Sequence, residues 1–293
     1  MHKSGYVNII GNPNVGKSTL MNALVGEKLS IITSKAQTTR HRIMGIVNGE
    51  DFQIIYSDTP GILKPNYKLQ ESMLKSVNNA FIDADIILYV TDPVEKYDKN
   101  QEYIDKVKKS NVPVLLLINK IDLTSEENLI KLVETWHEIL PKAEILPVSA
   151  LEKVNLSLLF DKIISLLPEV PEYYPKDSLT DKTERFIVSE IIREKIFMYY
   201  QKEIPYSVEV DVESFKEERD IIRILTNVYV MRESQKGIII GHKGSSLKKV
   251  GTEARKDIEA FFDKKVYLEI YVKVMKDWRD KENQLKRFGY NKS

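Results

Sequence analysis

Five short apolar runs, each ending in a small or polar residue, recur through the first 167 residues of the chain. They occupy 6–11, 52–58, 84–92, 112–120 and 143–149, with amphipathic stretches such as STLMNALVG and EENLIKLVETWHEIL between them. Near-continuous apolar strands that alternate with helices indicate a mostly parallel sheet covered on both faces. FQIIYSD follows MGIVNGED so closely that we also expect one antiparallel edge hairpin, with its turn near Asn48 and Gly49.

A proline-containing segment separates this α/β pattern from a different one. PEVPEYYPKDSLTD (168–181) has three prolines and no helical period, which is typical of a linker. The pattern after it is α-β-β-α-α-β, with a polar helical tail at the end. We therefore expect an α/β domain at 1–167, a linker at 168–182 and a small α+β domain at 183–293.

Composition and charge narrow the class of protein. Apolar residues make up 42% and charged residues 30% of the 293, and cysteine is absent, which excludes disulfides and thiolate metal sites. No apolar run suits a signal peptide or a membrane span, so we expect a cytoplasmic protein. Residues 231–293 hold 16 Lys/Arg against nine Asp/Glu. This excess of positive charge slightly favours an anionic partner for the C-terminal region.

The segment GNPNVGKS (11–18) matches the phosphate-loop pattern Gly-x-x-x-x-Gly-Lys-Ser. It follows an apolar run and opens a helical stretch, the context that distinguishes such a loop from an ordinary turn before a helix. Lys17 is expected at the β- and γ-phosphate oxygens, and Ser18 at Mg²⁺. The residues predicted to contact the nucleotide here are Asn14, Val15, Gly16, Lys17, Ser18 and Thr19.

Three further motifs follow in order, each at the end of an apolar run. Asp58-Thr59-Pro60-Gly61 offers a carboxylate for magnesium and a flexible main chain for the γ-phosphate. In NKID, the carboxylate of Asp122 can accept hydrogen bonds from guanine N1–H and its 2-amino group. Adenine leaves such a carboxylate unpaired, so the pattern favours GTP and GDP over ATP. The residues predicted around the base are Asn119, Lys120, Asp122, Ser149, Ala150 and Leu151.

The polar stretch KAQTTRHR (35–42) supplies a candidate switch loop. Thr38 or Thr39 can reach Mg²⁺ when a γ-phosphate is present and leave when it is gone. With Ser18 and Asp58, such a threonine completes the expected set of magnesium ligands.

The position after Gly61 is Ile62, where many GTPases carry a glutamine that orients water. Three explanations remain open: the main chain and metal hold the water, a partner supplies a group, or a second cation bound by Asn14 takes part. The residues expected to act in hydrolysis are Asn14, Lys17, Thr39 and Gly61.

A second glycine turn, GHKG (241–244), joins the apolar GIII to a helix expected to begin near Ser245. The simplest interpretation is a helix–turn–helix corner that uses glycine for backbone room. The α-β-β-α-α-β order around it favours instead a KH module, whose Gly-x-x-Gly turn holds a single-stranded nucleic-acid backbone. Isoleucines 238–240 are expected in the core or along the groove. The residues predicted to bind RNA are Ile240, Gly241, His242, Lys243, Gly244, Lys248 and Lys249.

With GNPNVGKST, QTTR, DTPG, NKID, SAL and IIIGHKGSSLKK in this order, the chain resembles the bacterial Era family of GTPases over essentially its whole length. The resemblance implies a Ras-like G domain followed by a type II KH domain. It implies slow GTP hydrolysis, and binding near the 3′ end of small-subunit (16S) ribosomal RNA during assembly of the 30S subunit. It points to Thr39 as the magnesium ligand, and to use of K⁺ as a hypothesis. Peripheral association with the inner membrane face is a weaker implication, and a monomer is expected.

Two other classes of function fit parts of the pattern. One is an RNA-binding scaffold that holds a guanine nucleotide only as a structural element. The other is a membrane-associated switch that acts on a protein effector.

Overall fold

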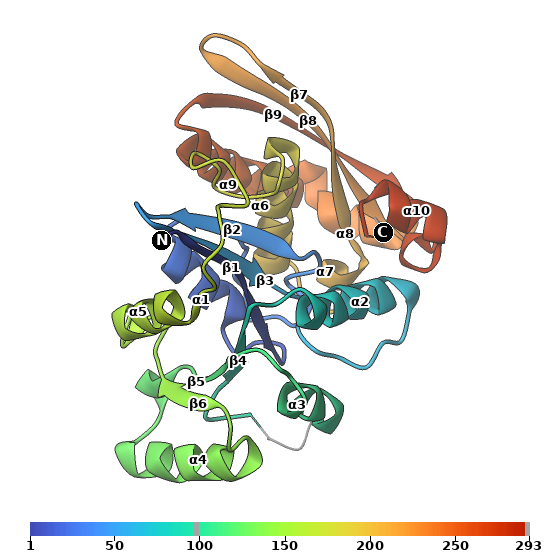
Figure 1. The fold of residues 1–293 in the computed structure, drawn as a ribbon. Helices are drawn as coiled ribbons and strands as arrows, with labels where there is room; N and C mark the ends of the chain where they lie inside the picture. Colours follow the sequence, from blue (N-terminus) through green and yellow to red (C-terminus); the bar gives the residue numbers. More distant parts are fainter. Residues whose placement is uncertain (96–99, 291–293) are drawn as a thin grey trace. The chain divides into compact units, whose positions relative to one another are not determined.

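The structure is a computed structural model that describes residues 1–95 and 100–290 (Figure 1). The chain forms two compact units, each assembled from three segments. The first unit comprises Met1–Ser30, Thr39–Pro65 and Met73–Asp181, and the second comprises Ile31–Thr38, Asn66–Ser72 and Lys182–Ser293. Two short segments from the N-terminal half of the sequence thus pack with the C-terminal region. The last residues of the α+β domain expected at 183–293, namely 291–293, lie outside the described part.

A six-stranded sheet in the order β2-β3-β1-β4-β5-β6 forms the centre of the first unit. Its strands are β1 (Lys3–Gly11), β2 (Ile43–Asn48), β3 (Phe52–Asp58), β4 (Ile86–Thr91), β5 (Val114–Ile118) and β6 (Glu144–Pro147). All neighbours are parallel except β2 and β3, which form the antiparallel edge hairpin predicted from the sequence. Every residue of β4 is buried, as a strand covered on both faces requires.

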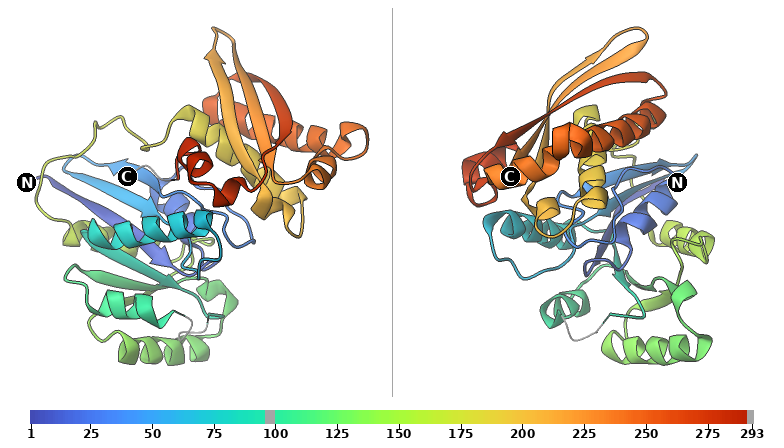
Figure 2. Two further views of the ribbon diagram at one scale, coloured as in Figure 1. Left: turned by 90° about the vertical axis from the view of Figure 1, so that its right-hand side faces the viewer. Right: turned by 180° about the vertical axis from the view of Figure 1, so that it is seen from behind.

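Helices cover both faces of this sheet (Figures 1 and 2). They are α1 (Lys17–Val25), α2 (Lys68–Ile82), α3 (Gln101–Lys108), the short 3₁₀ turn η1 (Ile121–Leu123), α4 (Glu126–Ile139) and α5 (Leu156–Leu166). Local sequence starts α4, because the Ser125 side chain accepts a hydrogen bond from the Asn128 N–H. On one face Val77, Tyr89 and Trp136 belong to a continuous apolar core.

The segment at 168–181, which we expected to be a linker, is held along the edge of the first unit. The N–H of Ile46 donates to the carbonyl of Leu179 at 2.9 Å. The buried side chain of Gln53 makes four hydrogen bonds, to Asn48, to the carbonyl of Tyr174 and from the N–H groups of Tyr173 and Tyr174. These contacts give the polar segment a defined path over the β2–β3 hairpin.

The second unit has the predicted order α-β-β-α-α-β with short additions. Its elements are α6 (Glu184–Tyr199), α7 (Ile204–Ser207), β7 (Glu209–Glu217), β8 (Ile221–Val230), α8 (Glu233–Ile240), η2 (His242–Gly244), α9 (Ser245–Phe262), β9 (Lys265–Val274), η3 (Trp278–Asp280) and α10 (Glu282–Arg287). The fold class predicted from the sequence is confirmed for both parts of the chain.

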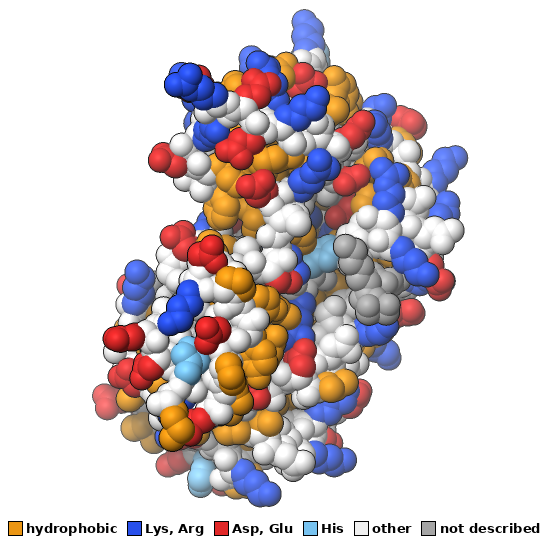
Figure 3. Space-filling model, turned by 45° about the horizontal axis from the view of Figure 1, so that its top comes forward, with side chains coloured by type: hydrophobic (Ala, Val, Ile, Leu, Met, Phe, Trp, Pro, Cys, Tyr) orange, Lys and Arg blue, Asp and Glu red, His pale blue; other side chains and the backbone are white. Residues whose placement is uncertain are grey.

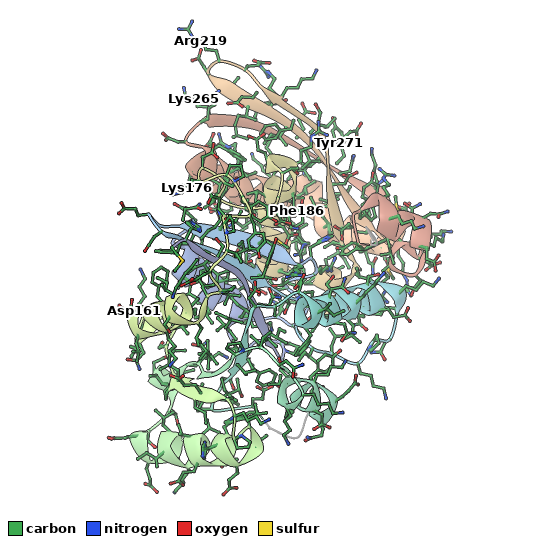
Figure 4. All side chains as sticks on the ribbon, viewed as in Figure 1. Asp161, Lys176, Phe186, Arg219, Lys265 and Tyr271 are labelled. Carbon is green, nitrogen blue, oxygen red and sulfur yellow. The ribbon has the colours of Figure 1, made fainter. Side chains whose placement is uncertain are left out.

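A three-stranded sheet, β7-β8-β9, carries α6 and α9 on one face. Alternate residues of β8, such as Ile222, Ile224 and Val228, enter the core with α6 and α9. The opposite face carries exposed side chains that include Tyr271, and Arg219 lies at the tip of the β7–β8 hairpin (Figure 4).

Among residues 1–95 and 100–290, no helix has both the length and the apolar character that crossing a bilayer requires.

We predict that Gln53→Leu frees the segment at 168–181, because it leaves three partly buried main-chain groups of Tyr173 and Tyr174 without their partner. The free energy of unfolding should fall by about 1–3 kcal/mol, and trypsin should cut faster after the exposed Lys176. Denaturant melts and mass analysis of the fragments measure both effects. Gln101→Leu, at an exposed glutamine of α3, serves as the control. Equal cleavage rates for the two variants would contradict the role given to Gln53.

Candidate functional site

The loop 11–18 connects the buried end of β1 to the start of α1. Gly16 has a φ of 95°, and a Cβ on it would lie 2.2 Å from the amide nitrogen of Asn119. Only glycine therefore fits at this position. Asn14 also has a positive φ, 66°. The loop is thus bent tightly around the N-terminus of α1, where main-chain N–H groups and the helix dipole favour an anion.

Lys17 is buried at the base of this loop. Its ammonium group donates to the carbonyls of Gly11, at 3.0 Å, and Asn12, at 2.7 Å. Burial lowers its pKa to about 8, although the negative charges of Asp58 and Glu95 act in the opposite direction. A bound polyanion would favour the charged form of Lys17, so the residue suits a phosphate group.

Three oxygen-bearing side chains meet beside the loop. The hydroxyl of Ser18 donates to Asp58 Oδ2 at 2.6 Å and lies 2.9 Å from that of Thr39. Thr39 Oγ1 is 3.3 Å from the same carboxylate oxygen. Asp58 is fully buried, and its other oxygen has no hydrogen-bond partner among residues 1–95 and 100–290. Burial raises the pKa of Asp58, an effect that the Ser18 hydrogen bond and the Lys17 charge partly offset.

This set fits a small hard cation, because Mg²⁺ prefers oxygen ligands and would use the unpaired carboxylate oxygen. Of the two threonines considered, Thr39 is the one beside Asp58. The hydroxyl of Thr38 instead donates to the carbonyl of Lys35 at 2.7 Å.

The residues after Asp58 lie against the phosphate loop. Gly61 is close to Pro13, and the N–H of Ile62 donates to the carbonyl of Gly11 at 3.2 Å. The Ile62 side chain is 2% exposed and belongs to the apolar core. At this position the chain therefore contributes a main-chain contact to the loop and a side chain to the core.

Asn119 connects the phosphate loop to the segment after β6. Its amide group donates to the carbonyl of Val15 at 2.8 Å, and its oxygen accepts from the N–H of Ala150 at 2.9 Å. Lys120 Nζ bonds the carbonyl of Asn14, at 2.5 Å, and Asp92 Oδ2, at 2.6 Å. These bonds bring the sequence-distant motifs to one edge of the sheet.

Asp122 and Ser149 form the outer part of this arrangement. The Ser149 hydroxyl donates to Asp122 Oδ1 at 2.5 Å, and Asp122 is exposed. Ala150 is buried, whereas the side chain of Leu151 is 72% exposed. The carboxylate can thus receive further donors from a ligand, with the main chain at 150 beside it.

Two acidic residues next to the loop were not predicted from the sequence. Asp92 pairs with Lys120, and Glu95 accepts hydrogen bonds from Asn12 and, at 2.8 Å, from Thr91. Burial raises the pKa of Glu95. Asp92 ends an apolar run just as Asp58 does, so its strand-end position was the available signal. Glu95 lies beyond the end of the strand, so no signal in the sequence pointed to its role.

The GHKG turn lies in the second unit, between α8 and α9. Gly241 has a φ of 71°, Lys243 of 49° and Gly244 of 79°. A Cβ on Gly241 would lie 2.2 Å from Ser246 Oγ. The N–H groups of Gly241 and Gly244 donate within the chain, to the carbonyls of Gly237 and Gly241. The side chains of His242 and Lys243 are exposed on this bend, so the turn presents one cationic and one polar side chain to solvent.

The helices beside the turn place the remaining predicted residues. Lys248 and Lys249 are exposed on α9, and Lys249 Nζ lies 4.2 Å from the centre of the Tyr199 ring. Ile239 is fully buried and Ile240 is half-buried. Of the two positions considered for Ile238, the core is excluded, because its side chain is 49% exposed.

On the face drawn in Figure 3, the charged side chains form no uniform basic patch. Lys and Arg side chains alternate there with Asp and Glu. Local geometry at the turn, rather than overall charge, therefore singles out the candidate anion site in this unit.

Comparison with known proteins matches two separate family models to the chain, one in each half of the sequence. Residues 6–120 match the family model described as 50S ribosome-binding GTPase, and residues 203–279 match that of the KH domain. The chain is 48% identical to the GTPase Era of Clostridium kluyveri over 292 residues, covering 99% of this chain and 100% of the relative. It is 47% identical to the GTPase Era of Syntrophus aciditrophicus, over 99% and 96% of the two chains.

Two solved structures are similar over nearly the whole chain. One is Era in complex with MgGDPNP and nucleotides 1506–1542 of 16S ribosomal RNA, with 40% identity, a TM-score of 0.95 and 99% coverage of both chains. The other is a variant of Aquifex aeolicus Era bound to GDP·AlF4⁻, with 41% identity, a TM-score of 0.94 and coverage of 98% and 99%. A nucleotide site of the GTPase type, a KH unit and full-length relatives at this identity lead to one conclusion: the chain belongs to the Era family of GTPases.

Proposed function

We propose that this chain is a GTP-regulated assembly factor that binds 16S ribosomal RNA near its 3′ end while the small ribosomal subunit matures. The observation that supports it is the presence, in one chain, of a nucleotide site joined by Asn119 and a GHKG turn of left-handed backbone. The relative solved with MgGDPNP and 16S RNA holds both kinds of ligand. The protein would act as a monomer in the cytoplasm, with the inner membrane face as a secondary location.

In the nucleotide site, the positions of the buried polar groups suit them to bind phosphate or magnesium. Lys17 exchanges its two carbonyl partners for phosphate oxygens. Ser18, Thr39 and Asp58 would hold Mg²⁺, which when bound neutralises phosphate charge. The main chain at Gly61, beside the phosphate loop, can donate to the γ-phosphate. Thr39 leaves Asp58 when the γ-phosphate has gone, so the segment before it responds to hydrolysis.

Hydrolysis in this chain must proceed without a side chain at position 62, because Ile62 is buried in the core. The attacking water is oriented by the main chain of Thr39 and Gly61. Asn14, in the phosphate loop, would hold a monovalent cation, which would supply positive charge in the transition state. The expected intrinsic rate is slow, because Ile62 stands where many GTPases have a glutamine that orients the water.

The base site selects guanine through Asp122. Its exposed carboxylate accepts from the Ser149 hydroxyl on one side and is open to N1–H and the 2-amino group on the other. ATP leaves it unpaired.

In the second unit, the GHKG turn would receive the RNA backbone, and the bases would lie beside Ile240. Lys243, Lys248 and Lys249 contribute charge near the phosphates. The turn and its flanking helices are the part that should crosslink to RNA.

The decisive experiment combines the two ligands. Full-length protein is bound to a 16S 3′-end oligonucleotide with a hydrolysis-resistant GTP analogue and crosslinked, and the attached peptides are identified. Crosslinks within 237–249 support the proposal, and crosslinks confined to other regions refute it. GTP hydrolysis that disappears in Lys17→Ala distinguishes a switch enzyme from a scaffold that merely holds a nucleotide.

We predict that Asp122→Asn changes base selectivity. Guanine loses its charged acceptor, so GTP affinity should fall about 100-fold. The new amide can pair with N1–H and the 2-oxo group of xanthine, so xanthosine triphosphate should bind better than to the parent. Competition binding with both nucleotides measures this. Asp161→Asn, at an exposed residue of α5, is the control. If GTP affinity stayed at the parent value, Asp122 would not contact the base.

We predict that Gly241→Asp and Gly244→Asp each weaken RNA binding tenfold or more. The corresponding loss of binding free energy is about 1.4 kcal/mol or more. Each variant introduces a negative charge and a Cβ at a positive φ in the turn. Filter binding or fluorescence anisotropy gives the affinity, and thermal melts check the fold. Gly237→Asp adds the same charge on α8 in open space. Similar losses in all three variants would point to general repulsion instead of a specific turn.

We predict that single-turnover GTP hydrolysis is about tenfold faster in KCl than in NaCl, a difference of about 1.4 kcal/mol in activation free energy. Asn14→Gly, which accepts the positive φ, should remove the difference. Equal rates of the parent protein in the two salts would end the potassium hypothesis.

A further inference from the structure

The segment 31–38, which directly precedes Thr39, is fastened to the C-terminal half of α6. The N–H of Ile32 donates to Glu194 Oε1 at 3.1 Å. Lys35 Nζ donates to the carbonyls of Phe197 and Tyr200, the latter at 2.8 Å. All these atoms belong to the second unit.

The ammonium group of Lys35 lies where it stabilises the C-terminal end of α6. The last carbonyls of a helix have no partner within the helix and carry the negative end of its dipole. An ammonium group that bonds two of them satisfies the helix end and fixes the loop that carries it. The loop is also fixed internally, because Thr38 donates to the carbonyl of Lys35 and lies 2.5 Å from the hydroxyl of Thr33.

Tyr200, whose carbonyl accepts from Lys35, is also bonded to α8, the helix that leads into the GHKG turn. The buried hydroxyl of Tyr200 donates to the carbonyl of Ile239 at 2.6 Å. Ile239 lies two residues before Gly241, the first residue of the turn. Burial raises the pKa of Tyr200 to about 12, so the hydroxyl remains a donor at neutral pH.

Tyr200 therefore bonds in two directions. Its carbonyl accepts from the segment that leads to Thr39, and its hydroxyl donates to the helix that leads into GHKG. A displacement of the Thr39 loop that withdraws Lys35 releases the end of α6, and with it the support of α8.

We propose that Lys35 and Tyr200 are positioning residues that connect the Thr39 loop to the GHKG turn, so that seating of Thr39 beside Asp58 and binding of RNA at the turn stabilise each other. This rests on the function proposed above. The two ligands then share one coupling free energy, and by linkage each changes the affinity of the other by the same factor.

The test measures that factor in full-length protein. The affinity for a 16S 3′-end oligonucleotide is determined with Mg²⁺ and a hydrolysis-resistant GTP analogue, and again with GDP. The ratio of the two affinities is the coupling, which a merely structural residue would not change. Tyr200→Phe removes only the hydroxyl. Lys35→Met removes the donors and keeps most of the stem, and Lys35→Arg restores donors to the carbonyls.

The matched control is Tyr199→Phe. Its tyrosine is adjacent, and the ring that Lys249 covers is retained. We expect Tyr200→Phe and Lys35→Met each to reduce the coupling ratio about fivefold, the effect of one lost hydrogen bond. Lys35→Arg and Tyr199→Phe should keep the ratio of the parent. GTP hydrolysis without RNA should be unchanged in Tyr200→Phe.

The possible results distinguish failure of the Lys35–Tyr200 connection from failure of the function proposed for the chain. If the parent protein couples the ligands and both Tyr200→Phe and Lys35→Met preserve its ratio, the connection is refuted and the proposed function stands. If the parent binds RNA equally in both nucleotide states, both proposals fall. A ratio that drops in Tyr200→Phe and Lys35→Met, and returns with Lys35→Arg, supports the connection.

Discussion

The side chain of Asn119 is the interaction on which the nucleotide site depends. One buried amide bonds the carbonyl of Val15 and the N–H of Ala150, and so sets the spacing between the phosphate loop and the base-side segment. Gly16 must be a glycine because that amide passes 2.2 Å from where a Cβ would stand. A parallel sheet brings its carboxyl ends to one edge, but it does not by itself fix the loops that leave them. The Asn119 side chain supplies this connection, and the predicted phosphate and base contacts on either side follow from it.

Around this connection the first unit buries the charged groups of Lys17 and Asp58. The described residues supply only part of the hydrogen bonds that these two groups can make. Lys17 is held by two carbonyls, and the pKa of its ammonium group is lowered mainly by burial. Within the described part of the chain, one buried oxygen of Asp58 has no hydrogen-bond partner, and burial raises the pKa of this carboxyl. A buried charge without a full set of partners is costly, so such groups are arranged for a ligand that completes them. A phosphate chain with a hard cation has the opposite charges at the required places.

The second unit is organised around α6, whose residues from Glu190 to Phe197 are all buried. A helix this buried must satisfy its charged side chains internally. Arg193 does so by bonding Glu190 at 2.7 Å, and Glu194 accepts from the N–H of Ile32. The helix thus serves as core for the three-stranded sheet and as the support of the segment 31–38. At its end, the carbonyl of Tyr200 accepts from Lys35 and the hydroxyl of Tyr200 donates to the carbonyl of Ile239, so one helix terminus bonds both the segment 31–38 and α8.

The linear sequence determined the strand and helix order, because burial on both faces of a strand and on one face of a helix leaves apolar periods that can be counted. It also indicated the motif residues Lys17, Asp58, Asn119 and Asp122, because each belongs to a motif that ends or directly follows a strand, at the edge where ligands of such sheets bind. The resemblance pointed to Thr39, and the structure places its hydroxyl 3.3 Å from Asp58. Only tertiary structure decided that Glu95 reaches Asn12 and that the Ile238 side chain is exposed. It alone assigned 31–38 and 66–72 to the second unit and brought Lys35 to the end of α6. Those outcomes depend on contacts between residues up to 165 positions apart, and the polar loops that make them carry no periodic pattern from which a partner can be inferred.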